Sequence, residues 1–156
     1  MTPPFSTVAV VVAAAGFGLR AASEMPKQYL EVVGKPILQH TLERFLACNP
    51  GQVVLVVAEG DDRWRRCVAP GTVTVVRGGA SRVESVRAGL AEVRQDLDWV
   101  MVHDAARPCF CAADLERLRS AADEDAVGAI LAVPVADTLK RESAGVIDCT
   151  IDRDGL

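Results

Sequence analysis

Aromatic residues are scarce in this chain: they make up 4% of its 156 residues, although 50% of the residues are hydrophobic. Val, Ala, Leu and Ile must therefore build the core. Such a core suits helices packed on a β-branched sheet better than a sandwich of two sheets with aromatic anchors. A chain of this length can bury one substantial core, so the composition predicts an α/β fold with a single domain over residues 1–156.

Long hydrophobic runs and an excess of positive charge are also missing. No stretch reaches the roughly 18 consecutive apolar residues of a membrane span, and residues 1–7 lack the basic start of a secretory signal. Seventeen Lys and Arg residues against 21 Asp and Glu give a net charge of −4, which would not attract nucleic acid. We expect a cytoplasmic protein with no membrane or nucleic-acid partner, in which any anion site is local.

The five cysteines form neither a disulfide framework nor a metal site. Their number is odd and they are scattered, which is typical of reduced thiols in a domain of this size. Cys109 and Cys111 form a C-x-C pair, but no second pair or nearby His completes four zinc ligands. We therefore expect free thiols.

Apolar runs alternate with helical patterns along the chain. Runs typical of strands occupy residues 7–13, 53–58, 73–76, 99–103 and 129–133. Helical patterns occupy residues 36–48, 81–95 and 113–123. Because crossovers between parallel strands are nearly always right-handed, this order predicts a doubly wound, mostly parallel, Rossmann-like sheet with ligands at the carboxyl ends of its strands.

The helix over residues 81–95 has the clearest start signal. Ser81 and Glu84 have the spacing of a capping box. The helical period predicts that its apolar residues face the sheet. These residues are Val83, Val86, Leu90 and Val93.

The pattern changes after Pro134. Two short polar-edged strands joined by a Ser-Ala-Gly turn predict a protruding β-arm over residues 136–152. The chain then ends on Asp-Arg-Asp-Gly-Leu without a closing helix. We therefore expect that the C-terminal part of a longer domain is absent.

A small-residue loop follows the first apolar run. Gly16 and Gly18 fit a dinucleotide-binding turn, but Pro26 interrupts the helix that such a turn should open. The acid at the end of the second predicted strand, Glu59, lies about 40 residues after the glycines rather than the usual distance of about 20. The G-K-[ST] ending of a Walker A loop is also missing. What remains is a loop long enough to wrap a triphosphate, with Arg20 and Lys27 as candidate phosphate-binding cations or, alternatively, as solvated surface charges.

Two further groups follow later strands. Asp104, at the end of a predicted strand and beside small residues, is a candidate Mg²⁺ ligand next to substrate phosphates. Arg107 could pair with a carboxylate or hold the turn, whereas His103 is better explained as a structural histidine. The glycines at 78 and 79 precede a helix start, where backbone can approach a base or ribose closely, or where they simply form a tight turn.

These motifs together resemble one family. A-A-A-G-F-G-L-R, P-K-Q-Y-L, G-G-A-S-R-V-E-S-V, V-H-D-A-A-R-P and D-R-D-G-L occur in the order found in the 2-C-methyl-D-erythritol 4-phosphate cytidylyltransferases of the non-mevalonate isoprenoid pathway. The resemblance runs from about residue 8 to the last residue. Ribitol 5-phosphate cytidylyltransferases share P-K-Q, but Ala15 and Ala106 favour the erythritol enzymes.

The resemblance implies a cytidylyltransferase that transfers CMP from CTP to 2-C-methyl-D-erythritol 4-phosphate and releases pyrophosphate. It implies that Arg20 and Lys27 act on the triphosphate, that Asp104 holds Mg²⁺, and that Arg153 reaches the acceptor phosphate. Arg107 is a further substrate-binding candidate. The nucleotide pocket would be lined by Ala14, Ala15, Gly16, Gly79 and Ser85.

The same resemblance implies a homodimer formed through the arm. The sequence departs from the family pattern at two positions: Ala13 stands where many members have proline, and Ala80 stands where some have an acidic residue. Two alternatives remain open at this point. One is a ribitol 5-phosphate cytidylyltransferase, and the other is a truncated, non-catalytic nucleotide-binding module.

Overall fold

The computed structural model of the chain describes residues 5–16, 25–125 and 127–156. It divides into two compact units, Met1–Glu116 and Arg117–Leu156, and each is treated by itself below. The expectation of one domain over residues 1–156 stays a prediction. In the part of the chain that is described, no helix has the length and apolar character needed to span a bilayer.

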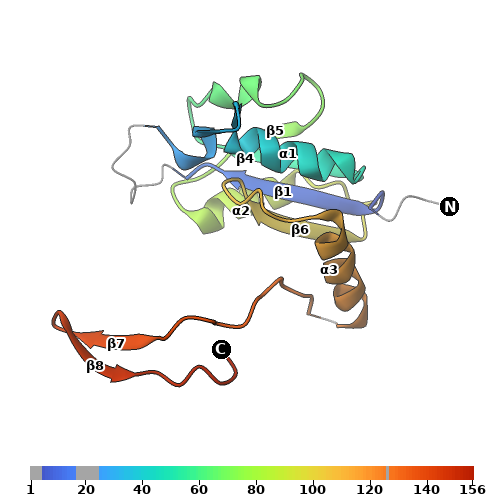
Figure 1. Cartoon of the computed structure of the whole chain (residues 1–156). Coiled ribbons are helices and arrows are strands. Elements are labelled where there is room, and N and C mark those ends of the chain that lie inside the picture. Colours follow the sequence, from blue (N-terminus) through green and yellow to red (C-terminus); the bar gives the residue numbers. More distant parts are fainter. Residues whose placement is uncertain (1–4, 17–24, 126) are drawn as a thin grey trace. The chain divides into compact units, whose positions relative to one another are not determined.

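A four-stranded parallel sheet forms the first unit, and its strands follow the order β5-β4-β1-β6 (Figure 1). Its strands are β1 (Val8–Ala14), β4 (Gln52–Val57), β5 (Thr74–Arg77) and β6 (Trp99–Asp104). The chain builds outward from β1 to β5 and then crosses to the other side of β1, so the strand order reverses between β1 and β6. In open α/β sheets such a reversal leaves a crevice at the carboxyl ends of the strands. The predicted doubly wound α/β sheet is confirmed.

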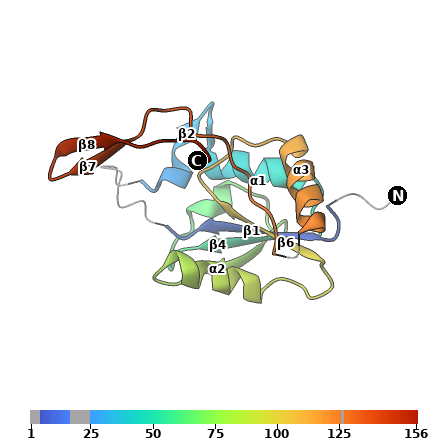
Figure 2. The same ribbon diagram turned by 90° about the horizontal axis from the view of Figure 1, so that it is seen from below.

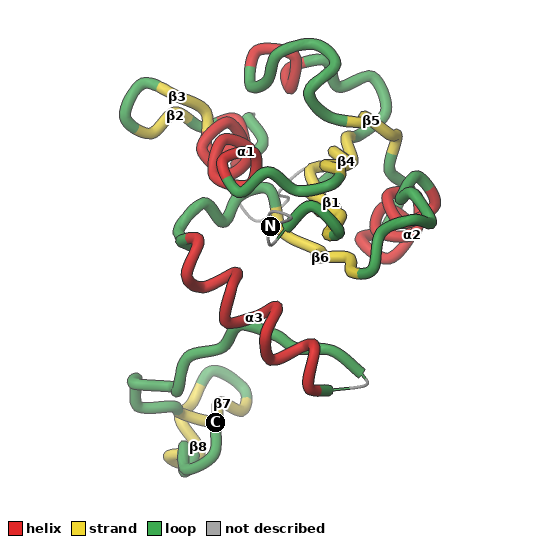
Figure 3. Tube along the Cα trace, turned by 90° about the vertical axis from the view of Figure 1, so that its right-hand side faces the viewer, coloured by secondary structure: helices red, strands yellow, loops and turns green. Residues whose placement is uncertain are grey.

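Helices α1 (Ile37–Ala47) and α2 (Arg82–Ala91) cover opposite faces of this sheet (Figures 2 and 3). The larger core cluster lies on the α1 face and combines alternate β1 residues with Leu38, Leu42 and Phe45 of that helix. Leu115, near the start of α3 (Ala112–Glu124), joins the same cluster. The three predicted helices are therefore present, each with slightly different bounds.

The packing predicted for the segment over residues 81–95 is only partly correct: Val86 is half-buried and Val93 packs against buried valines of β1 and β4, but two other residues do not face the sheet. The capping box of α2 is confirmed: the Ser81 side chain accepts from the Glu84 N–H, and the Glu84 carboxylate accepts from the Ser81 N–H. Val83 is 69% exposed and Leu90 is 41% exposed, so neither is a core residue. The helix approaches the sheet so closely that only small side chains fit beneath it, and Ser85 and Gly89, one helical turn apart, are buried instead.

The strand predicted over residues 129–133 is wrong. The structure has no strand there, and Ile130 and Val133 are each 86% exposed. An apolar run becomes a strand only when a neighbouring strand pairs with its backbone. Among the described residues, β6 pairs with β1 alone.

The predicted arm is a two-stranded antiparallel hairpin in the second unit. Its strands are β7 (Lys140–Ser143) and β8 (Val146–Thr150), drawn in red in Figure 1. Ala144 and Gly145 form the turn with φ angles of +52° and +80°. Two consecutive positive φ values are those of the hairpin turn that matches the twist of the flanking strands. Every residue of both strands is exposed.

Three small elements complete the first unit. The 3₁₀ turn η1 (Lys27–Tyr29) is followed by a short hairpin of β2 (Glu31–Val32) and β3 (Lys35–Pro36). A second 3₁₀ turn, η2 (Arg63–Arg66), follows β4. Both 3₁₀ turns lie on connections that leave or approach the carboxyl edge of the sheet, where the candidate site residues gather.

Candidate active site

The end of β1 lies beside the end of β6. Ala13 is the register partner of Asp104, and the Ala105 N–H donates to the Ala13 carbonyl at 3.0 Å. The three predicted pocket residues Ala14, Ala15 and Gly16 follow directly, and exposure increases from buried Ala14 to exposed Gly16. The small residues after β1 and the carboxylate after β6 therefore meet at the reversal of strand order.

The turn between β5 and α2 packs on the same loop. A Cβ atom on Gly78 would lie 2.7 Å from the Ala15 Cβ and 2.6 Å from the Ser85 Oγ, distances that leave no room for a side chain. A Cβ on Gly79 would lie 2.4 Å from the Glu84 Cβ. Both glycines are thus required by close approach, and they bring the backbone of this turn against the loop after β1.

Ser85 lies beneath this turn and is 4% exposed. Its hydroxyl donates to the Ser81 carbonyl at 2.9 Å, and its Oγ is 3.4 Å from the Gly79 carbonyl. The hydroxyl donor is therefore used within the helix, whereas its oxygen can still accept a hydrogen bond. The structure brings together Ala15, Gly79 and Ser85, three of the predicted pocket residues.

Asp104 is held by two arginines. Arg82, from the first turn of α2, donates to Oδ1 at 3.1 Å, and Arg107 lies with its Nε 3.2 Å from Oδ2. The arginine side chains are 66% and 78% exposed, and that of Asp104 is 36% exposed. Arg107 thus pairs with a carboxylate, as one of its two predicted roles requires.

Asp104 can serve as one ligand of Mg²⁺ but not as a complete site. The described residues contain no group of three or more His, Cys, Asp or Glu side chains that could hold a metal. Mg²⁺ usually binds one or two carboxylates and takes its other ligands from water and substrate phosphates, so a single carboxylate suffices beside a triphosphate. One of the two arginine pairs would have to open, and exposed pairs of this kind contribute less than about 1 kcal/mol. The donor set therefore fits the ion.

His103 is a structural histidine, as expected. Its ring packs edge-on against Phe45 and Phe110, with a centroid distance of 5.0 Å to each, and the two phenylalanine rings are 4.5 Å from each other. Its Nε2 is 2.8 Å from the Arg107 carbonyl. Burial lowers the pKa of His103 and keeps the ring neutral near pH 7. Its hydrogen bond fixes the turn that carries Arg107.

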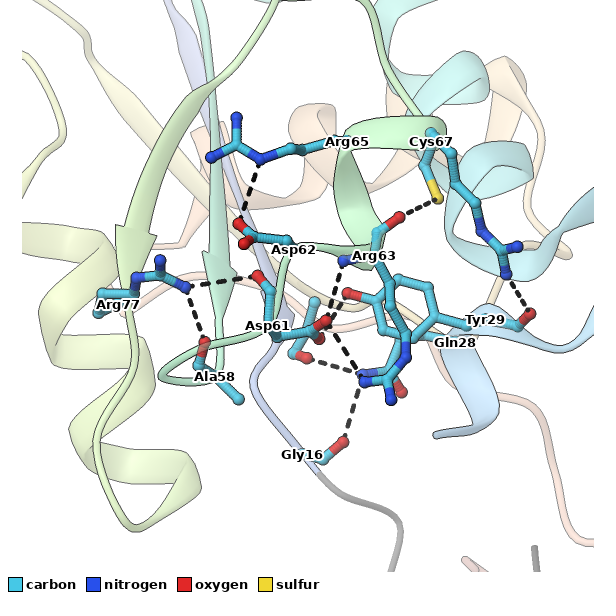
Figure 4. Close-up of polar contacts among 12 residues, drawn as sticks. Gly16, Gln28, Tyr29, Ala58, Asp61, Asp62, Arg63, Arg65, Cys67 and Arg77 are labelled. Atoms are coloured by element: carbon cyan, nitrogen blue, oxygen red, sulfur yellow. Dashed lines mark hydrogen bonds and ion pairs between the residues drawn. The ribbon is translucent and has the colours of Figure 1, made fainter. Parts of the chain in front are cut away.

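Lys27 begins η1 and is exposed, whereas its neighbours Gln28 and Tyr29 are buried. The Gln28 side-chain amide donates to the carbonyl of Ala14 at 2.8 Å and to that of Gly16 at 3.3 Å (Figure 4). The backbone next to Lys27 is thereby fixed to the end of β1. The candidate cation at position 27 consequently lies at the same carboxyl edge as the pocket residues.

Tyr29 fixes the other side of η1. Its hydroxyl donates to the Asp61 carboxylate at 2.8 Å, and both side chains are buried. Burial, followed by the bond to Asp61, raises the Tyr29 pKa far above its usual value, so the phenol stays protonated. Arg77, at the end of β5, donates to the carbonyls of Ala58 and Asp61 and holds this loop in place (Figure 4).

Two predicted residues are not part of this geometry. Arg20 lies outside the described residues. Arg153 belongs to the second unit, where it donates to the Ala136 carbonyl and lines a pocket of about 400 Å³. The other residues of that pocket are Thr138, Thr150, Ile151 and Asp152.

Gln28 and Arg82 are the two site residues that sequence reasoning did not assign. In the sequence, Gln28 stands out only as part of the P-K-Q motif. This local motif does not indicate which distant carbonyl groups the glutamine side chain binds. Arg82 directly follows a capping Ser81, and the pairing of its guanidinium with Asp104 joins positions 22 residues apart. Neither contact has a sequence period that could have predicted it.

Comparisons with family models, protein sequences and solved structures all identify the same family. The family model for IspD, 2-C-methyl-D-erythritol 4-phosphate cytidylyltransferase, matches residues 8–156. The chain is 45% identical over 161 residues to the 2-C-methyl-D-erythritol 4-phosphate cytidylyltransferase of Klebsiella pneumoniae, with 100% of this chain and 68% of that protein covered. The chain thus spans about two thirds of the length of this relative.

Solved structures agree. A 4-diphosphocytidyl-2C-methyl-D-erythritol synthase aligns with a TM-score of 0.79 and 38% identity over 96% of this chain and 70% of that one. The 2-C-methyl-D-erythritol 4-phosphate cytidylyltransferase of Thermus thermophilus aligns with a TM-score of 0.72 and 26% identity over 94% of this chain and 64% of that one. With the small-residue loop, the glycine turn and Asp104 at one edge of the sheet, the chain belongs to the IspD family of cytidylyltransferases, which are nucleotidyltransferase enzymes.

Proposed function

We propose that the protein transfers CMP from CTP to 2-C-methyl-D-erythritol 4-phosphate in isoprenoid precursor synthesis. A phosphate oxygen of the acceptor attacks the α-phosphorus of CTP in line, a new P–O bond forms, and the bond to the β-phosphate breaks to release pyrophosphate. The family match over residues 8–156 carries this proposal. The meeting of β1, the β5–α2 turn and β6 at one edge of the sheet supports it.

The cytosine nucleotide would lie on the carboxyl edge of the sheet. The close packing of the Gly78-Gly79 turn on Ala15 leaves backbone groups, rather than side chains, to approach the base and ribose. Ser85 would offer its hydroxyl oxygen as an acceptor from below. The proposed nucleotide-binding residues are Ala14, Ala15, Gly16, Gly79 and Ser85.

Arg20 and Lys27 would act on the triphosphate. Cations aimed at a phosphoryl group stabilise the charge that develops during displacement, most strongly where water is excluded. Lys27 is suited to this role because its side chain is exposed while both following residues are anchored in the interior. Arg20 takes its role from the motif alone.

Asp104 would hold Mg²⁺ against the phosphates. When bound, the ion neutralises phosphate charge and orients the triphosphate. Binding of the ion to Asp104 would displace Arg82 or Arg107 from this carboxylate. The displaced arginine could then pair with a phosphate group and so keep a negatively charged partner.

The acceptor phosphate would be reached by Arg153, and Arg107 would contact substrate. We further propose that the exposed hairpin over residues 136–152 crosses to a second copy and forms a homodimer in the cytoplasm. The erythritol names of the relatives favour this acceptor over ribitol 5-phosphate.

The first test is the shift in melting temperature with CTP and Mg²⁺, compared with ATP and NADH. A ligand at 100 times its dissociation constant adds about 2.7 kcal/mol of stability, which is readily measured. A CTP-selective rise supports the site. The absence of any rise in a cooperatively melting protein would refute the proposed nucleotide pocket.

A substitution at Lys27 tests the role of this cation. Lys27→Ala should lower kcat by about 10²- to 10³-fold, since loss of one preorganised charge donor typically has this effect. Lys35→Ala is the matched control, because Lys35 is an exposed lysine close in sequence whose ammonium group pairs with Glu43 at 2.8 Å. Pyrophosphate release measures both, and near-normal turnover of Lys27→Ala would contradict the assignment.

Arg153 tests the acceptor side separately. Arg153→Ala should raise KM for the sugar phosphate while leaving CTP binding nearly unchanged, because the residue would touch only the acceptor. Steady-state kinetics with each substrate varied in turn distinguishes the two effects. A loss confined to CTP affinity would show that Arg153 belongs to the nucleotide site.

A further inference from the structure

Gln28 occupies an unusual place in the site. It is 6% exposed, and its side-chain amide reaches two carbonyls of the loop after β1, those of Ala14 and Gly16. These carbonyls are separated by one residue and lie 14 and 12 positions from Gln28. One side chain therefore bridges the last residue of the central strand and the beginning of the loop that leaves it.

The same residue follows Lys27 directly. The backbone of η1 is closed by the Tyr29 N–H bond to Pro26 at 2.9 Å and the Leu30 N–H bond to Lys27 at 3.2 Å. Movement of Gln28 would therefore carry Lys27 with it. The amide fixes the spacing between the small-residue loop and the candidate phosphate-binding lysine.

We propose that Gln28 is a positioning residue for triphosphate binding: it holds the loop after β1 and Lys27 at a fixed separation through its two carbonyl hydrogen bonds. This role rests on the proposed function of the site. Gln28 touches no phosphate itself. Its loss would remove the Gln28 donor from the carbonyls of Ala14 and Gly16 and would allow this backbone and the lysine to move apart.

The chain contains a matched control. Gln52, the first residue of β4, also ties two backbone segments together, because its amide donates to the Glu92 carbonyl at 2.9 Å and its carbonyl accepts from the Arg94 N–H at 2.9 Å. It lies at the amino edge of the parallel sheet, away from the candidate site. Gln52→Met and Gln28→Met remove the same chemical group. The Gln28 substitution removes two hydrogen bonds, and the Gln52 substitution removes the two given above and a longer one of 3.4 Å to the Thr74 hydroxyl.

Binding of CTP, CMP and inorganic triphosphate to the wild-type protein and both variants should be measured by calorimetry. Gln28→Met should weaken CTP and triphosphate binding by about tenfold or more, with a clearly smaller loss for CMP, whereas Gln52→Met should leave all three unchanged. Such a phosphate-selective loss does not follow from lower stability alone. Equal losses for CTP and CMP, or equal effects of the two substitutions, would overturn the assignment.

A second measurement needs no variant. In the ¹⁵N-labelled wild-type protein, the Gln28 side-chain amide resonances should shift on addition of inorganic triphosphate and of CTP. Absence of a shift on triphosphate binding would overturn the role of Gln28 alone. Absence of CTP and triphosphate binding by the wild-type protein would overturn the proposed function and, with it, this assignment.

Discussion

Gly89 provides the sharpest test of how α2 packs on the sheet. A Cβ atom at this position would lie 2.5 Å from Val11 Cγ1 and 2.7 Å from Val56 Cγ2, and both valines are completely buried. Helix propensity by itself predicts that Gly89→Ala stabilises the protein by about 1 kcal/mol. The tertiary contacts predict the opposite sign.

The expected change in stability for Gly89→Ala is the cost of overpacking the core minus the gain in helix propensity. Overpacking a well-packed core costs about 1–3 kcal/mol. Because both contacts would be shorter than 3.0 Å and would involve stiff β-branched side chains, we expect the cost at Gly89 to be about 3 kcal/mol. After subtraction of the propensity gain of about 1 kcal/mol, Gly89→Ala should destabilise the protein by about 2 kcal/mol. For a chain of this length, the melting temperature should fall by about 4–8 °C.

Urea and thermal unfolding followed by circular dichroism measure this change. Arg87 supplies the control, because it lies on the exposed side of the same helix. Arg87→Ala should be more stable than Arg87→Gly by about 1 kcal/mol. If Gly89→Ala were as stable as the wild-type protein or more so while the control behaved as expected, the close approach of α2 to Val11 and Val56 would be wrong.

Two further predictions concern the buried groups around η1 and η2. Tyr29→Phe removes the 2.8 Å bond to the buried Asp61 carboxylate and should cost about 1.5–3 kcal/mol in urea unfolding; an unchanged midpoint would contradict the bond. Burial raises the pKa of Cys67 to about 11, so only about 0.1% is thiolate at pH 8. Iodoacetamide at pH 8 should therefore modify Cys67 far more slowly than the exposed Cys109 and Cys111, a difference that should vanish in urea, and equal rates in the folded protein would be inconsistent with burial.

Local patterns in the sequence were sufficient for most of the fold. The unbroken apolar run that became β1 predicted a buried parallel strand, because both faces of a parallel sheet are covered. Ser81 and Glu84 predicted the start of α2, since a capping box uses groups only three residues apart. The hairpin over residues 136–152 was predicted because its turn and alternation are also local.

Errors arose where the outcome depended on a partner. Residues 129–133 have the composition of a strand, but none of the strands in the described part of the chain pairs with them. Val83 follows a helical period, yet it is 69% exposed because the sheet accepts only Ser85 and Gly89 beneath α2. The period of a helix predicts that one face is buried, but the shape of the opposing surface decides which face.

For the candidate site, the sequence by itself determined the residue types: small residues after β1, two glycines before α2, a lysine after a proline, and a carboxylate after β6. Only the tertiary structure decided which of them act together. It paired Arg82 with Asp104 across 22 positions, joined Tyr29 to Asp61 across 32, and aimed the amide of Gln28 at the carbonyls that end β1. A hydrogen bond between distant positions depends on distances that the folded sheet sets, and no local pattern in a single chain encodes them.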